Sequence, residues 1–267
     1  MKKFITFVNK TLEQKDYAYE ELFCFFSKQD NLPVYQYKFQ KGQTFFRARK
    51  NNSFKNFSTF KELSYPPNEL VLKYNRANKP LQNVLYVSDS WLTNLAELKL
   101  FLLNELAIGE IFWVTQAEWE ILEEIKVLII PDFQNTKMSD FIKNFVSKDN
   151  TKEQVEFLKI INKYFRTPVK PKKTDSPIYK FTSAFCNSLI AESIRNNNKI
   201  DGILYTSVEH NSGFNLTLNN DLINEGKMRI KNVVKHYLIK SNKSEINNHI
   251  DPIKAKEIDY KNSKIIW

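Results

Sequence analysis

Residues 73–99 read KYNRANKPLQNVLYVSDSWLTNLAELK, and this stretch joins a turn, a strand and a helix in short succession. Its segment 84–88, VLYVS, is rich in the β-branched and aromatic residues that favour a strand. Ser90 is a good helix N-cap, and the apolar spacing after it predicts a helix over about 91–107. A strand followed at once by a helix, in a chain with other strands, indicates the α+β class.

The predicted helix carries an unusual acid. Between 91 and 101 the only acidic residue is Glu97, and its neighbours are mostly apolar. A partly buried carboxylate must be neutral, paired or functional. Lys99 lies two residues away and does not face it on a helix. A salt bridge to Arg47 or Arg76 is the structural alternative to a functional role for Glu97.

Further elements are predicted on both sides of this stretch. The predicted strands cover 44–49, 111–115, 127–132 and 203–208, and the predicted helices cover 11–28, about 154–165 and 181–195. Pro33 closes the first helical region. The segment 133–177 is rich in Lys, Asn, Asp and Pro around a single predicted helix, which favours an insertion over a second domain. No element is predicted after Gly226, where the chain is basic.

Composition narrows the classes of function. The chain has 267 residues, which fits one large domain or two small ones. It has only 5 glycines and neither glycine-rich phosphate-loop motif, so a glycine-loop nucleotide fold is disfavoured. The net charge of +10 suits an anionic partner. The lysines are scattered, which favours a solvated surface over a nucleic-acid groove, and a nucleic-acid-binding or protein-binding module stays open as the alternative to an enzyme.

Cysteine and histidine usage gives weak signals. The two cysteines, Cys24 and Cys186, are far apart and make no disulfide framework, so we expect a reducing cytoplasm. Cys186 reads as a core thiol. The first ten residues do not resemble a signal peptide, and no run has the length of a membrane span. His210, His236 and His249 lack metal-ligand spacing, so no metal site is expected.

Three of the predicted strands each have one mixed face. Alternation places together Phe45, Arg47 and Arg49 in the first strand, Val84, Tyr86 and Ser88 in the second, and Ile203, Tyr205 and Ser207 in the third. An antiparallel sheet with one solvated face explains any one of them. Two guanidinium groups on one face repel each other unless they meet an anion, which indicates an anion site.

The order of the motifs FFRAR, YNRANKP, VLYVSDSWLTNLAELK and DGILYTSVEH, the last ahead of FNLTL, resembles the RES domain family over roughly 44–220. Better-known members of that family are bacterial toxins that destroy NAD. The resemblance implies an ADP-ribosyltransferase-like core of mixed, mainly antiparallel β-sheets flanked by helices. It divides the chain into an N-terminal helical extension, 1–43, a RES-like catalytic domain, 44–225, and a basic C-terminal extension, 226–267.

The resemblance also implies site residues. It assigns catalysis to Arg47, Glu97 and Ser207, and NAD binding to Arg47, Arg76, Asn78, Tyr86 and Ser207. Arginines hold a pyrophosphate by charge-assisted bonds, with Arg49 a weaker third candidate. A tyrosine such as Tyr86 stacks on the cationic nicotinamide ring, and Glu97 stabilises the oxocarbenium-like ribose. Ser207 holds the ribose or the carboxamide.

The implied activity is cleavage of the nicotinamide–ribose bond of NAD by hydrolysis or phosphorolysis, with inorganic phosphate as the co-substrate in the second case and no prosthetic group. An ADP-ribosyltransferase that modifies a protein uses the same site and stays open. Toxins of this family are usually paired with an antitoxin that carries a helix-turn-helix, so the resemblance implies such a partner. The N-terminal region and the insertion could instead cover the cleft in cis.

Overall fold

The computed structural model describes residues 6–7, 18–29, 32, 34–52, 55–132, 151–169 and 176–267. Within these ranges no helix is both long enough and apolar enough to cross a membrane.

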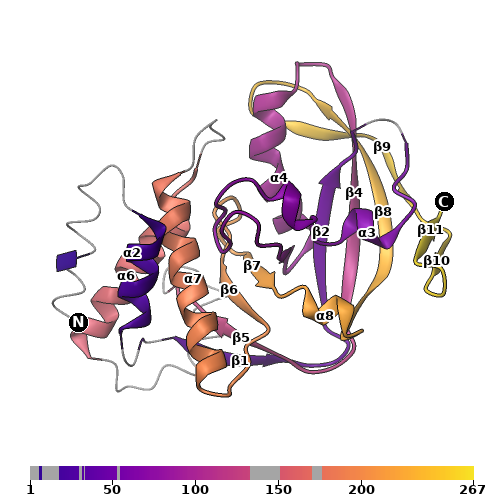
Figure 1. Cartoon of the computed structure of the whole chain (residues 1–267). Coiled ribbons are helices and arrows are strands. Elements are labelled where there is room, and N and C mark those ends of the chain that lie inside the picture. Colours follow the sequence, from indigo (N-terminus) through magenta and orange to yellow (C-terminus); the bar gives the residue numbers. More distant parts are fainter. Residues whose placement is uncertain are drawn as a thin grey trace.

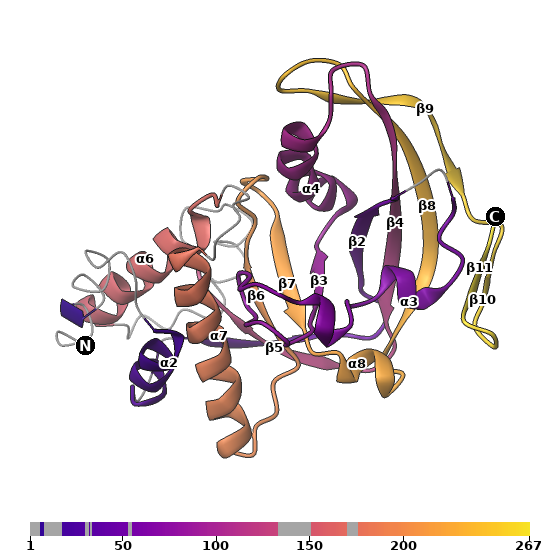
Figure 2. The ribbon, with the colours of Figure 1, turned by 45° about the horizontal axis from the view of Figure 1, so that its top comes forward.

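The described chain is a mixed α/β structure built on one large, mainly antiparallel sheet (Figures 1 and 2). Its nine strands are β1 (Tyr35–Phe39), β2 (Thr44–Lys50), β3 (Leu85–Ser88), β4 (Ile111–Ile121), β5 (Ile125–Ile129), β6 (Gly202–Thr206), β7 (Phe214–Leu218), β8 (Met228–Lys240) and β9 (Ile246–Lys254). They run in the order β1-β5-β6-β7-β3-β2-β4-β8-β9, and β5 with β6 is the parallel pair. A short hairpin of β10 (Glu257–Asp259) and β11 (Lys264–Ile266) stands apart.

Three helices gather beside the β5–β6 part of the sheet, as Figure 1 shows. The helices of the structure are α2 (Tyr19–Ser27), α3 (Phe60–Leu63), α4 (Trp91–Glu105), α6 (Lys152–Arg166), α7 (Pro177–Arg195) and α8 (Asp221–Asn224), with a 3-10 turn η1 at Asn68–Leu70. Helices α2, α6 and α7 share one apolar core with β5 and β6, in which Phe26, Phe157 and Phe185 are fully buried. A second apolar core is formed mostly by side chains of the sheet strands and includes Trp119 and Leu204.

Helix α4 covers the part of the sheet around β2 and β3. Ser90 caps it, because its Oγ accepts the Thr93 amide at 3.2 Å. At its other end Leu102 and Leu106 pack against Phe112 in a small third core. Helix α4 is therefore fixed at both ends, which holds the residues of its first two turns over the end of β3.

The strands and helices predicted around the opening stretch are confirmed with small shifts in their bounds. Residues 11–17 of the first predicted helix, and Pro33, lie outside the described residues. Strands β1, β7, β8 and β9 were not predicted, and β4 continues to Ile121 instead of ending at 115. The extra length of β4 comes from its pairing along β8 over the whole strand, which no local signal shows.

The sheet takes strands from each of the three regions into which the resemblance divides the chain. Strand β1 comes from 1–43 and pairs with β5, and β8 comes from 226–267 and pairs with β4. The segment 133–177, interpreted as an insertion, contributes α6 to the core through an apolar face. This face consists of Phe157, Leu158, Ile161, Tyr164 and Phe165. Described strands from all three regions thus pair within one sheet.

Candidate active site

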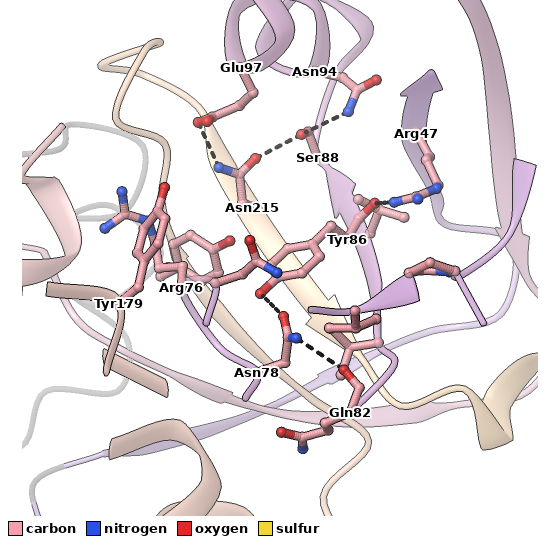
Figure 3. A pocket seen from close by; sticks show the side chains of 16 residues that line it. Arg47, Arg76, Asn78, Gln82, Tyr86, Ser88, Asn94, Glu97, Tyr179 and Asn215 are labelled. Atoms are coloured by element: carbon pink, nitrogen blue, oxygen red, sulfur yellow. Dashed lines mark hydrogen bonds between the residues drawn. The ribbon is translucent and has the colours of Figure 1, made fainter. Parts of the chain in front are cut away.

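A pocket of about 300 Å³ opens where β3, α4, α7 and the loop before β3 meet (Figure 3). It is lined by Arg47, Pro66, Val71, Asn75, Arg76, Asn78, Gln82, Val84, Tyr86, Val87, Ser88, Asn94, Glu97, Tyr179, Tyr205 and Asn215. Five of the six predicted site residues are in this set, although they come from four separate segments of the chain. Its volume is at the lower end of the usual range for small-molecule sites, about 300–1,000 Å³.

The pairing register explains why one sheet face is polar here. Tyr86 on β3 pairs with Thr217 on β7, while Ser88 pairs with Asn215 and Asn215 with Tyr205 on β6. Residues paired across neighbouring strands point to the same face. The polar faces of β3 and β6 are therefore joined into one surface by β7, one of the strands that were not predicted.

Glu97 reaches this surface from α4. Its Oε1 accepts the Ser207 hydroxyl at 2.6 Å, the Asn215 side-chain amide at 2.8 Å and the Val208 backbone N–H at 3.3 Å. Within the described part of the chain Glu97 forms no ion pair, so the proposed salt bridge to Arg47 or Arg76 is absent. These three bonds all end on Oε1, which leaves Oε2 for a ligand.

Ser207 is fully buried and does not line the pocket. Its Oγ donates to Glu97 and accepts the backbone N–H of His210 at 3.0 Å. Ser207 is therefore connected to the pocket only by its hydrogen bond to Glu97, among the described contacts. Direct contact with a ribose or a carboxamide, the role implied by the resemblance, does not follow from this position.

Arg47 supplies a positive charge to the pocket, and no carboxylate in the described part of the chain forms an ion pair with it. Its Nη1 donates to the backbone carbonyl of Tyr86 at 3.1 Å, and its buried Nε has no hydrogen-bond partner in the structure. Burial, and then the neighbouring Arg49, lower the pKa of Arg47 from its ordinary value to about 10. A partly buried guanidinium whose hydrogen-bond acceptor is neutral favours an anionic ligand.

Arg76 is buried on another wall of the pocket, and in Figure 3 it lies on the opposite side of Tyr86 from Arg47. Its Nη1 donates to Tyr164 O at 3.1 Å and its Nη2 to Thr167 O at 3.3 Å, which ties the pocket to the end of α6. Its Cζ lies 5.3 Å from the ring centroid of Tyr179. These partners are neutral, and among the described residues no carboxylate forms an ion pair with Arg76, although Glu209 is near enough for Arg76 to oppose the rise in its pKa.

Tyr86 and Asn78 fix each other at the base of the pocket. The Tyr86 hydroxyl donates to Asn78 Oδ1 at 2.7 Å and accepts the Ala77 N–H at 3.0 Å. Asn78 Nδ2 donates to the Gln82 carbonyl at 3.0 Å and so closes the turn. Burial raises the pKa of Tyr86 well above its ordinary value of 10, so the phenol stays neutral. The two hydrogen bonds of its hydroxyl hold the Tyr86 ring in place as one wall of the pocket.

Arg49 is not part of the pocket. It is exposed, its Nη1 donates to Glu62 O at 2.8 Å, and its Cζ lies 5.3 Å from the Phe57 ring centroid.

Glu209 is a second acid near the site. Partial burial and then the nearby charge of Glu97 raise the pKa of Glu209 above its ordinary value.

Sequence reasoning missed several lining residues that the structure adds. They are Ser88, Asn94, Tyr179, Tyr205 and Asn215. Ser88 and Tyr205 stand on the mixed faces discussed above, and alternation along FNLTL would have placed Asn215 on one face of a strand. Their proximity to Glu97 depends on the sheet order, which the sequence does not reveal.

Among the described residues no cluster of three or more His, Cys, Asp or Glu side chains could hold a metal ion. Cys186 is buried in α7, and burial raises the pKa of its thiol.

A comparison of the sequence with models of protein families and with curated proteins finds no match. These comparisons assign no function, so a proposal about function must start from the arrangement of the pocket.

Proposed function

We propose that the chain is an NAD-degrading enzyme with an ADP-ribosyltransferase-like core, which cleaves the nicotinamide–ribose bond by hydrolysis or phosphorolysis. The observation that carries the proposal is the meeting of Arg47, Arg76, Asn78, Tyr86 and Glu97 in one pocket. These residues are the ones that the resemblance to the RES domain family singles out, and the same residues combine cationic, aromatic and anionic groups within one site.

The charges of the pocket match the parts of NAD. Arg47 and Arg76 form no ion pair with a described carboxylate, and the pyrophosphate of NAD is a dianion that guanidinium groups bind by paired hydrogen bonds. Tyr86, Tyr179 and Tyr205 offer aromatic surface to the flat nicotinamide ring. Glu97 is the one carboxylate among the lining residues, and it suits the ribose, where positive charge develops.

Cleavage then needs only a few groups. The bond between C1′ of the ribose and the nicotinamide nitrogen breaks, and its electron pair leaves with nicotinamide, which becomes neutral. The ribose becomes oxocarbenium-like, and Glu97 Oε2 stabilises its charge while three donors hold Oε1 in place. Water or phosphate attacks C1′ and completes the reaction, with a proton released when water attacks.

Incubation of the purified protein with NAD, with and without inorganic phosphate, tests the proposal. Free nicotinamide together with ADP-ribose indicates hydrolysis, and nicotinamide with phosphorylated ADP-ribose indicates phosphorolysis. Nicotinamide release that requires an added protein, which becomes ADP-ribosylated, indicates the transferase instead. Unchanged NAD under all three conditions would refute the proposal.

An enzyme of this kind drains the NAD of its host, so we also propose that a separate inhibitor protein with a helix-turn-helix restrains it. The inhibitor would have to block the pocket that holds Arg47 and Glu97, and the guanidinium groups of Arg47 and Arg76 would attract an acidic segment. Expression of the chain alone in cells tests this idea. Arrested growth with depleted NAD is expected, whereas normal growth and normal NAD would contradict a free toxin.

A further inference from the structure

A continuous series of hydrogen bonds leads through the protein interior to Glu97. Gln116 Nε2 donates to Asn94 Oδ1 at 3.3 Å, and Asn94 Nδ2 donates to Ser88 Oγ at 3.3 Å. The Ser88 hydroxyl donates to Asn215 Oδ1 at 2.7 Å, and Asn215 Nδ2 donates to Glu97 Oε1 at 2.8 Å. Figure 3 shows the last three bonds of this series, from Asn94 through Ser88 and Asn215 to Glu97.

Every donor in this series is buried. Gln116 is 5% exposed, Asn94 8%, Ser88 2% and Asn215 7%. Polar groups at such burial are stable only when they are paired, so each member depends on the next. The pairing of β3 with β7 is made by backbone groups and does not itself require polar side chains at these positions.

The series has a fixed direction, because both of its ends are acceptors. At one end Gln116 Nε2 also donates to the backbone carbonyl of Trp91 at 3.3 Å, and a carbonyl can only accept. At the other end stands the Glu97 carboxylate, which also only accepts when ionised. The hydroxyl of Ser88 could point either way on its own, but the Asn94 amide that donates to it turns its proton towards Asn215.

We propose that Asn215 is a positioning residue for Glu97, and that the series from Gln116 through Asn94 and Ser88 sets its orientation. A flipped Asn215 amide would place its oxygen against Glu97 Oε1 and its NH₂ against Ser88. With Asn215 held as it is, Oε1 is occupied and Oε2 is directed to the ligand. The inference rests on the proposed function, because it assigns the fixed Oε2 to the ribose of NAD.

Ser88→Ala tests the series without touching Glu97, Asn215 or Ser207. It removes the donor that orients Asn215, so we expect kcat for NAD cleavage to fall about tenfold while KM changes less than twofold. Ser88→Thr keeps the hydroxyl and should retain kcat within about threefold of the wild type. Ser188→Ala is the matched control, because Ser188 is equally buried but lies in α7 outside the pocket and bonds to Phe185 O.

A second readout does not depend on activity. The side-chain amide of Asn215, assigned in NMR spectra by its loss in Asn215→Ser, should exchange slowly with water in the wild type. It should shift and exchange faster in Ser88→Ala, and stay unchanged in Ser188→Ala.

The two readouts separate the possible failures. If the wild type does not cleave NAD, the proposed function fails and the amide spectra alone decide the inference. If the wild type cleaves NAD, two results would overturn the inference while the proposed function stands. One is a Ser88→Ala variant with wild-type kcat and an unchanged Asn215 amide, and the other is equal impairment of the Ala and Thr variants.

Discussion

Replacing Glu97 by Gln is the sharpest test of the mechanism, because the change removes a charge and little else. A glutamine carbonyl oxygen in the place of Oε1 still accepts from Ser207, Asn215 and Val208. The fold and the melting temperature should therefore stay close to those of the wild type. Glu97→Ala is a poorer choice, since it leaves these buried donors without an acceptor, at a cost of about 1–3 kcal/mol for each unsatisfied group.

The expected loss of activity follows from the charge. A full positive charge about 4 Å from a carboxylate is stabilised by about 4 kcal/mol at an effective dielectric constant near 20. An oxocarbenium-like ribose carries most of that charge, so the loss should reach about 2.7 kcal/mol, which is roughly a hundredfold in kcat. Nicotinamide release under saturating NAD measures it. A folded Glu97→Gln variant with near wild-type turnover would remove Glu97 from the mechanism.

Three other changes probe the pocket and its support. Arg47→Lys should raise the KM for NAD about tenfold, because a lysine lacks the guanidinium fork, whereas the exposed Arg49→Lys should leave KM within twofold; equal responses would place the anion site elsewhere. Gly213→Ala would drive a Cβ into Thr93 Oγ1, so urea unfolding should show a loss of about 1–3 kcal/mol, and unchanged stability would contradict the close approach. Burial lowers the pKa of His236 below 6.5, and the structure gives neither ring nitrogen a partner, so the neutral form stabilises the fold above about pH 6.5 and this contribution is lost as the pH falls. The free-energy difference between His236→Phe and the wild type should therefore grow in favour of the variant from pH 7 to pH 5, and a difference independent of pH would contradict this reasoning.

The elements with strong local signals could be predicted from the sequence. Ser90 before an apolar run predicts α4, and the alternation in TFFRAR predicts β2. Strand β8 could not be found in this way. Its buried residues include the polar neighbours Lys235 and His236, which point to opposite faces, and its pairing with β4 shifts register next to Glu118, so the simple alternation is broken.

The residues of the candidate site also divide into those with a signal in the sequence and those without one. Glu97 stands out because charged residues are rare in apolar surroundings, Arg47 and Arg76 were assigned from the resemblance of their motifs, and these three do line one pocket. Asn215 has no such signal. Its importance comes from the bonds to Glu97 and Ser88, and these exist only because β7 lies between β3 and β6. The role expected for Ser207 also depended on burial, which a single sequence does not show.

Nicotinamide release by the purified wild-type chain, with the protein in excess over NAD, tests the central claim most directly. Under these conditions a single turnover is enough for detection, so a slow catalyst is not missed. The account predicts that free nicotinamide rises to match the NAD supplied, at a rate roughly a hundredfold lower with Glu97→Gln. Intact NAD after prolonged incubation with the folded protein, in the presence and absence of phosphate, would contradict it.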